Sequence, residues 1–149
     1  MPARKTWVLV ADGVCGRLFR LTMPGYRLTP ALDHDLLRAR RPAREIGADR
    51  PGRTFDSTTP ARHAMEPPTD LERQEQIRFA EAIAAELEAH HQKGEFERLY
   101  VVAAPRLLGD LRQAWSAALK TAIADELAKD YSKAAPEALA AHLEKWLRG

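Results

Sequence analysis

The residues best suited to chemistry in this 149-residue chain are the arginines gathered between residues 38 and 68. That segment holds seven arginines, no lysine and four acidic residues, a formal charge of +3, whereas the whole chain carries +2. A guanidinium group is a planar fork that grips phosphate or carboxylate at two points, which an ammonium group does not. Long connections without helical or strand periodicity are usually functional or disordered. The segment therefore predicts either a phosphate-binding loop or a solvated loop whose arginines bind nothing specific.

In the first of these interpretations the partner is RNA, contacted mostly through phosphate, with a steep salt dependence and little sequence specificity. Phe55 is the only aromatic residue of the segment. It either stacks on an unpaired base or anchors the loop on the domain, which is the commoner role of a loop hydrophobe. The candidate RNA- and phosphate-binding residues are Arg44, Arg50, Arg53, Arg62 and Phe55.

The other reactive side chains give weaker signals. Cys15 is the single cysteine, so an internal disulfide is impossible. We expect its small thiol to be buried within the second strand, as part of the core packing. His90 and His91 are adjacent, which places them about 100° apart on a helix, so they do not chelate one metal, and we expect both to be exposed. His142 is expected to be a partly buried packing residue. We expect no cofactor and no metal ion.

The composition, 45% hydrophobic and 30% charged, is typical of one globular domain, which we assign to residues 1–149. Near the N-terminus, two runs rich in valine and leucine flank Asp12-Gly13, a dipeptide typical of a two-residue hairpin turn. The runs predict strands at about residues 6–11 and 14–22. Alternating apolar residues from Tyr26 to Leu32 predict a third strand at the sheet edge. The chain thus begins with a three-stranded meander.

A long helix is predicted after the arginine-rich segment. Thr69 and Glu72 fit a capping box, and Gly94 fits the position that follows a helix. Between them, apolar residues recur at helical spacing on one face. These residues are Leu71, Phe79, Ile83 and Leu87, with Ala80 and Ala84 between them.

The rest of the chain alternates between strand and helix signals. The apolar run at residues 99–104 predicts a central strand covered on both faces. A second helix is predicted from Pro105 to Leu119, and a C-terminal helix from Pro136. Residues 120–131 are ambiguous, because their propensity favours a helix but a strand would complete a second βα unit.

Several phrases of the sequence carry a resemblance to a known family. The most specific are DRPGRTFDS together with ARHAMEP in the arginine-rich segment, and LYVVAAPRLLGDLR after it. Through these phrases the chain resembles the bacterial host attachment family, the proteins required for attachment to host cells. The resemblance implies a single α/β domain of the ribonuclease H-like class, with a mixed sheet, a long basic loop at residues 38–68 and a strand at residues 120–127.

That family is similar in turn to the middle domain of archaeal and eukaryotic peptide-chain release factors, where the corresponding loop carries Gly-Gly-Gln. This sequence contains no Gly-Gly-Gln and has Pro51-Gly52-Arg53 instead, so peptide release is not implied. The resemblance implies binding to RNA or the ribosome. It favours Arg50, Arg53 and Arg62 among the candidates, because these three lie in the family-like phrases.

Two further functions stay open. One is a protein-interaction factor that acts in host attachment. The other is a nuclease, since a ribonuclease H-like fold can hold two divalent metals on carboxylates for phosphodiester cleavage. Asp12 is better explained as a turn residue than as a metal ligand, and Asp33 and Asp35 are better explained as solvated charges at the end of a strand. The carboxylates available to a nuclease are Asp12, Asp33, Asp35, Asp49 and Asp56.

The sequence also bears on location and assembly. The N-terminus lacks the apolar core of a signal peptide, and no apolar run approaches the ~20 residues of a membrane span, so we expect a cytoplasmic protein. The oligomeric state is left open, although a sheet edge at residues 26–35 is suited to a dimer contact.

Overall fold

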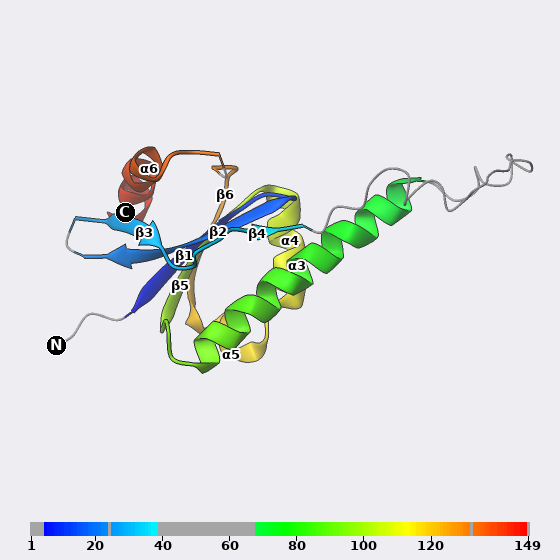
Figure 1. The fold of residues 1–149 in the computed structure, drawn as a ribbon, viewed down its shortest axis with the longest axis horizontal. Helices are drawn as coiled ribbons and strands as arrows, with labels where there is room; N and C mark the ends of the chain where they lie inside the picture. Colours follow the sequence, from blue (N-terminus) through cyan, green and yellow to red (C-terminus); the bar gives the residue numbers. More distant parts are fainter. Residues whose placement is uncertain (1–4, 24, 39–67, 132, 149) are drawn as a thin grey trace, which may run out of the picture.

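The computed structural model describes residues 5–23, 25–38, 68–131 and 133–148. In this part of the chain, six strands form one open mixed sheet in the order β3-β2-β1-β5-β6, with β4 beside β2 (Figure 1). β1 pairs antiparallel with β2 and parallel with β5, and β5 pairs parallel with β6. This arrangement confirms the predicted α/β class with a mixed sheet. The strands are β1 (Thr6–Ala11), β2 (Cys15–Thr22), β3 (Arg27–Pro30), β4 (Leu36–Leu37), β5 (Arg98–Ala103) and β6 (Ile123–Ala128).

Helices cover both faces of the sheet (Figure 1). α3, α4 and α5 pack on one face, where Leu9 and Val101 point, and α6 packs on the other, where Val8 and Val102 point. Because successive strand residues face opposite layers, both of which are covered, β1 is apolar from Trp7 to Ala11 and β5 from Leu99 to Ala103. The helices are α3 (Pro68–Gln92), α4 (Pro105–Ala114), α5 (Ala117–Ala122) and α6 (Pro136–Arg148).

The hairpin between β1 and β2 differs from the predicted turn by one residue. The Asp12 N–H donates to the Cys15 carbonyl at 2.9 Å, so the two loop residues are Gly13 and Val14. Asp12 Oδ1 accepts the backbone N–H groups of Val14 and Cys15 at 2.8 Å each. Gly13 does not have a positive φ. The turn therefore depends on the Asp12 carboxylate, which satisfies two backbone donors.

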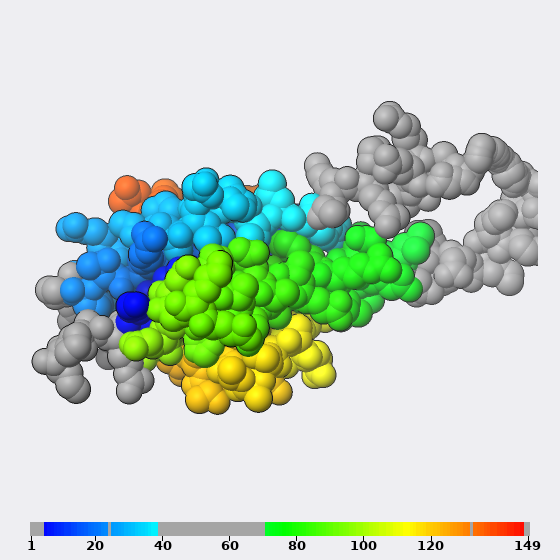
Figure 2. All heavy atoms as spheres, turned by 60° about the horizontal axis from the view of Figure 1, so that its bottom comes forward, coloured from blue at the N-terminus to red at the C-terminus, as the bar shows by residue number. Residues whose placement is uncertain are grey.

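The long helix α3 begins earlier than its pattern predicted. It starts at Pro68, so Thr69 lies inside the helix and the predicted capping box is wrong. Leu71 was assigned to the buried face but is 47% exposed. The reason is visible in Figures 1 and 2, where the N-terminal end of α3 projects beyond the sheet. At the other end, Gly94 has a φ of 75°, which confirms its predicted position after the helix.

The C-terminal end of α3 holds His90 between two carboxylates. His90 Nε2 lies 2.9 Å from Glu86 Oε2, and His90 Nδ1 lies 2.6 Å from Glu95 Oε1. The imidazole also packs on the indole of Trp7, with 5.2 Å between ring centroids. The prediction that His90 is exposed is therefore wrong, because β1 passes directly beside this turn of the helix.

The other two histidines considered above also differ from prediction. His91 is partly buried, not exposed, and packs against Phe96 with 5.2 Å between ring centroids. His142 is exposed rather than partly buried, and it stacks on Tyr131 with 4.8 Å between centroids. Each of these histidines packs against an aromatic residue outside the helices, and helical spacing in the sequence does not predict such contacts.

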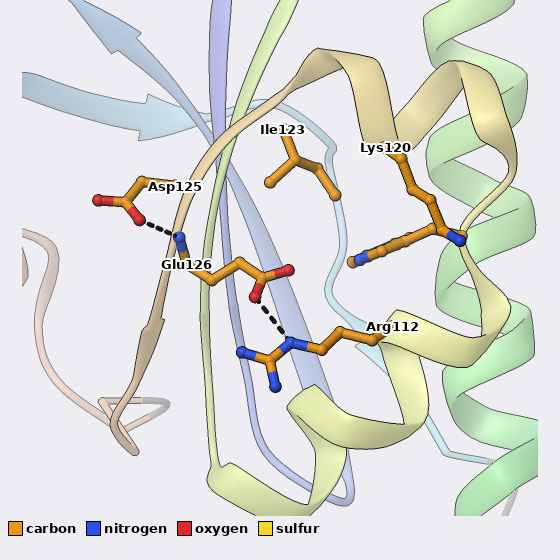
Figure 3. Close-up of a pocket in the computed structure, with 6 residues that line it drawn as sticks. Arg112, Lys120, Ile123, Asp125 and Glu126 are labelled. Carbon is orange, nitrogen blue, oxygen red and sulfur yellow. Dashed lines mark hydrogen bonds and ion pairs between the residues drawn. The ribbon is translucent and has the colours of Figure 1, made fainter.

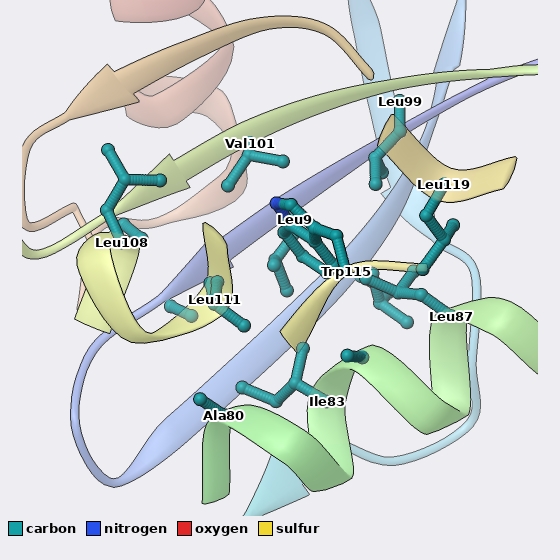
Figure 4. Packing of buried hydrophobic residues seen from close by; sticks show 14 of the residues in the cluster. Leu9, Ala80, Ile83, Leu87, Leu99, Val101, Leu108, Leu111, Trp115 and Leu119 are labelled. Atoms are coloured by element: carbon teal, nitrogen blue, oxygen red, sulfur yellow. The ribbon is translucent and has the colours of Figure 1, made fainter. Parts of the chain in front are cut away.

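The helix predicted from Pro105 to Leu119 is in fact two helices. Trp115 has an extended backbone, and Ser116 begins the next helix with its Oγ accepting the Leu119 N–H at 3.1 Å. Ser116 Oγ in turn donates to Glu88 of α3. This corner directs the Trp115 indole into the core, among buried leucines (Figure 4).

The ambiguous stretch resolves as a strand over most of its predicted length. Residues 123–128 form β6, while residues 120–122 belong to α5. β6 lies parallel to β5, with Leu127 beside Val102. The tertiary pairing thus overrides the helical propensity of the alanines and the leucine.

Candidate binding site at the base of the arginine-rich segment

The entering side of the arginine-rich segment is held where β1 turns into β2. On the entering side, β4 pairs with the start of β2, with Leu37 beside Cys15. The next residue, Arg38, donates its backbone N–H to the Val14 carbonyl at 2.9 Å. The backbone of Arg38 is thereby fixed against the β1–β2 turn. On the leaving side, the chain returns as the projecting end of α3.

A forked ion pair joins these two sides. Arg38 Nη1 donates to Glu72 Oε2 at 3.0 Å, and Arg38 Nη2 donates to Glu72 Oε1 at 3.4 Å. Gln76 Nε2 also donates to Glu72 Oε2 at 3.3 Å. The Arg38 side chain is 19% exposed and that of Glu72 is 53% exposed. We call this pair the Arg38–Glu72 clasp.

The hydrogen bond from Arg38 has the largest effect on the pKa of Glu72. The bond from Arg38 lowers the pKa of Glu72 below its ordinary value, burial opposes this shift, and the charge of Arg38 and the bond from Gln76 add to it. Glu72 is therefore a carboxylate at neutral pH, and the positive charge of Arg38 is matched within the domain. The clasp thus joins the residue that precedes the arginine-rich segment to the first turns of the helix that follows it.

A second forked pair fixes the projecting end of α3 to α4. Arg73 Nη1 donates to Asp110 Oδ2 at 2.8 Å, and Arg73 Nη2 donates to Asp110 Oδ1. The Asp110 side chain is only 8% exposed, and its hydrogen bonds raise the pKa of Arg73. The base of the segment is thus tied to the sheet through Arg38 and to the helical layer through Arg73.

Of the carboxylates considered for a nuclease, Asp12 has a structural role, whereas Asp33 is exposed and contacts its neighbour His34. Asp12 satisfies two N–H groups of the hairpin turn. Asp33 lies 2.8 Å from Nδ1 of its neighbour His34, and this hydrogen bond lowers the pKa of Asp33. In the described part of the chain, no three His, Cys, Asp or Glu side chains are grouped so as to hold a metal ion.

Cys15 is half-buried beside Asp35, with 3.9 Å between Sγ and Oδ2. Burial raises the pKa of the Cys15 thiol, and the charges of Asp35 and Asp12 raise it further. The thiol is therefore protonated at neutral pH and is a poor nucleophile. Cys15 begins β2, within the predicted strand, but it is only partly buried and belongs to neither core cluster, so the predicted core-filling role is not confirmed.

The predicted contact residues of the segment fall outside the described residues, and so do two of the carboxylates considered for a nuclease. They are Arg44, Arg50, Arg53, Phe55 and Arg62, together with Asp49 and Asp56.

Sequence reasoning missed the role of Arg38. The sequence does show where the two partners of the clasp lie: Arg38 is the first arginine of the segment, and Glu72 is the first glutamate of the helix that follows. Pairing across 34 residues follows only when β4 and α3 are known to approach each other.

The family comparison covers nearly the whole fold. Residues 7–143 match the sequence model of the family described as protein required for attachment to host cells. The chain belongs to this family. The match runs from β1 through the arginine-rich segment into α6, so both sides of the clasp are part of the family domain. No match to the chain was found among curated proteins.

Within residues 5–23, 25–38, 68–131 and 133–148, none of the helices combines the length and the apolar character needed to span a membrane.

Proposed function

We propose that this member of the host attachment family is a binding protein whose residues 39–67 contact RNA phosphate. The Arg38–Glu72 clasp carries the proposal. Because Glu72 matches the charge of Arg38, the closed segment retains six arginines against four acids. Positive charge between two flanking residues that are joined by an ion pair suits a polyanionic partner, since the ion pair lowers the conformational entropy that the segment can lose on binding.

The candidate contacts are Arg44, Arg50, Arg53 and Arg62, whose guanidinium groups suit phosphate oxygens. Phe55 is the candidate for stacking on an unpaired base. Ribosomal RNA is the first RNA to test, because from its sequence the family is expected to be similar to release-factor middle domains, an expectation that the family match does not test. Since Gly-Gly-Gln is absent, the proposed role is binding without peptide release.

The proposal is tested by gradient sedimentation of cell lysate at low and moderate salt. The test variant carries Arg50→Ala, Arg53→Ala and Arg62→Ala together. A matched control removes the same charge from exposed positions elsewhere: Arg27→Ala, Arg106→Ala and Lys145→Ala. We expect the wild type and the control to travel with ribosomes at low salt and the test variant to stay at the top. If all three proteins stay at the top, or all three travel together, the RNA proposal fails.

A second candidate, a protein-interaction factor in host attachment, is favoured by a separate observation. Leu37 is 70% exposed and Val14 is 49% exposed, and both lie beside the clasp. Exposed aliphatic side chains that gather at one end of a sheet are typical of protein contacts. The double variant Val14→Thr/Leu37→Ser tests it. If the double variant loses a co-sedimenting protein and the triple arginine variant keeps it, the protein-interaction function replaces the RNA proposal.

A further inference from the structure

A groove of about 320 Å³ lies between β4 and the middle of α3. One wall is the chain from residue 34 to residue 37, and the other consists of Ala82, Ile83 and Glu86 on one turn of α3. The volume is at the lower end of the range for ligand sites, roughly 300–1,000 Å³. A groove of this size between an extended segment and a helix suits the side chains of a peptide.

The floor of the groove is apolar. Leu36 and Ile83 both approach Gly16 of β2, where a Cβ would lie 3.5 Å from Ile83 Cδ1 and 3.7 Å from Leu36 Cβ. Ile83 is fully buried and Leu36 is partly buried, whereas Leu37 in the wall is 70% exposed. An aliphatic side chain that enters the groove therefore removes apolar surface of both molecules from water.

The edge of β4 offers backbone groups to a partner as well. Among the described strands, β4 pairs only with β2. The Arg38 N–H points to β2, where it donates to the Val14 carbonyl, and hydrogen-bonding directions alternate along an antiparallel strand. The N–H and C=O groups of Leu37 therefore point away from β2. An extended peptide can pair with such an edge.

The charge of the groove is negative. Its lining holds Asp35 and Glu86 but no lysine or arginine, so its formal charge is −2 when His34 is neutral. Asp35 is exposed, and its nearest donor is the weak one of the Cys15 thiol at 3.9 Å. Glu86 contacts His90 at 2.9 Å and remains 40% exposed. Such a lining repels phosphate and attracts lysine or arginine side chains.

We propose that this groove binds an extended peptide segment of a partner protein, in which a lysine or arginine lies two positions from an aliphatic residue. Side chains two positions apart share one face of an extended chain, so both enter the groove together. The aliphatic side chain rests on Leu36 and Ile83, and the cation pairs with Asp35 and Glu86. The proposal deepens the protein-interaction candidate for the surface around Leu37, and it rests on that candidate.

Two blocked tripeptides are suitable probes, because they have nearly the same shape and differ by one charge. One is acetyl-Leu-Thr-Arg-amide, and the other has citrulline in place of arginine. The readout is the methyl signals of Leu36, Leu37 and Ile83 in ¹³C-labelled protein. We expect the arginine peptide to shift these signals saturably. The citrulline peptide is expected to bind about tenfold more weakly, as the loss of charge-assisted hydrogen bonds predicts.

A pair of charge variants separates the groove from general attraction. Asp35→Asn is exposed and leaves the core intact, and we expect it to weaken binding of the arginine peptide about threefold, as for an exposed ion pair. The matched control is Asp125→Asn on β6, at the other side of the sheet. Oδ1 of Asp125 accepts the Glu126 backbone N–H at 2.8 Å, which an asparagine oxygen also does (Figure 3). This control should bind the peptide as the wild type does.

A pair of leucine variants tests the apolar contact. Leu37→Ser should weaken binding at least about fivefold, because it removes apolar surface that the peptide covers. Leu71→Ser, at an exposed leucine outside the groove, is the matched control and should have no effect.

The proposal is overturned if the arginine peptide leaves the three methyl signals unmoved, if the citrulline peptide binds equally well, or if Asp35→Asn and Asp125→Asn behave alike. These failures are distinguishable from failure of the protein-interaction candidate. If Val14→Thr/Leu37→Ser loses a co-sedimenting protein although the arginine peptide does not bind, that candidate stands and a basic peptide is the wrong partner.

Discussion

The two ends of α3 are held by different physical means. At the C-terminal end, Ile83 and Leu87 are fully buried against the sheet, and the helix ends at a glycine with positive φ. At the N-terminal end the helix projects beyond the sheet, with Leu71 exposed, and two forked ion pairs hold it in place (Figure 1). Apolar burial stabilises one end, and charge fixes the direction of the other.

This difference separates stability from binding. Burial of large apolar side chains contributes several kcal/mol, whereas a half-exposed ion pair such as Arg38–Glu72 contributes about 0–1 kcal/mol but fixes geometry. The end of α3 that contributes little stability is also the one from which the arginine-rich segment departs. Substitutions at the C-terminal end of α3 should therefore lower stability more than RNA binding. Substitutions at the N-terminal end should lower RNA binding more than stability.

The largest effect is expected from Leu87→Ala. Leu87 is fully buried in the main core cluster, so its truncation should lower the free energy of unfolding by about 2–5 kcal/mol. Chemical denaturation of the purified protein measures this. The matched control is Ile77→Ala on the exposed surface of the same helix, which should change stability by less than about 0.5 kcal/mol. Equal losses in the two variants would contradict the comparison.

A smaller effect is expected at the end of α3. Gly94 has a φ of 75°, and a Cβ there meets no atom within 4 Å, so the cost of Gly94→Ala is conformational alone. We expect a loss of about 1 kcal/mol. Gly109→Ala in α4 has equally open surroundings without a positive φ, and should instead raise stability by about 0.5–1 kcal/mol. Thermal unfolding of both variants tests the pair, and a stabilised Gly94→Ala variant would refute the prediction.

The clasp should contribute still less to stability. Arg38→Met and Glu72→Gln are each expected to lower the free energy of unfolding by less than about 1 kcal/mol, because Glu72 is half exposed. A double-mutant cycle between the two isolates their coupling. If the clasp positions the segment, both variants should weaken RNA binding more than they weaken folding. A loss of several kcal/mol in stability would show that the N-terminal end is part of the core after all.

The smallest effect concerns pH. The pKa of Glu72 is lowered in the folded state from an ordinary value of 4.5. Its contribution is thus fully present above that value and is lost as the pH falls through the lower, folded-state pKa. Wild type and Glu72→Gln should therefore converge in stability as the pH falls below about 4.5, while their difference stays constant from pH 6 to 8. Denaturation series across this range measure the difference, and a gap that widens in acid would have the wrong sign.

The sequence predicted the parts of the fold that depend on periodicity. β1, β2, β5 and α6 appear where apolar spacing placed them, because buried faces impose that spacing directly. The helix break at Trp115 was missed, since Ser116 caps the second helix within a pattern that remains helical across the break. The exposure of Leu71 was missed because the length of α3 relative to the sheet is a property of the assembled fold.

The candidate site was predictable only in its composition. The run of arginines is evident in the sequence, but the clasp joins residues 34 positions apart and depends on β4, a two-residue strand too short to leave a pattern. The groove between β4 and α3 was not predicted either. Its walls are residues 34–37 and one turn of α3, which approach each other only in the folded chain.

The most direct test of the account is the salt dependence of RNA binding by the purified protein. Fluorescence anisotropy with a labelled ribosomal RNA hairpin gives the slope of log affinity against log salt for the wild type, the triple arginine variant and the charge-matched control. We expect the triple variant to reduce the slope by about 2–3 and the control to leave it nearly unchanged, since each lost phosphate contact removes about one. Equal slopes for the two triple variants would contradict the claim that the clasped segment is the RNA contact.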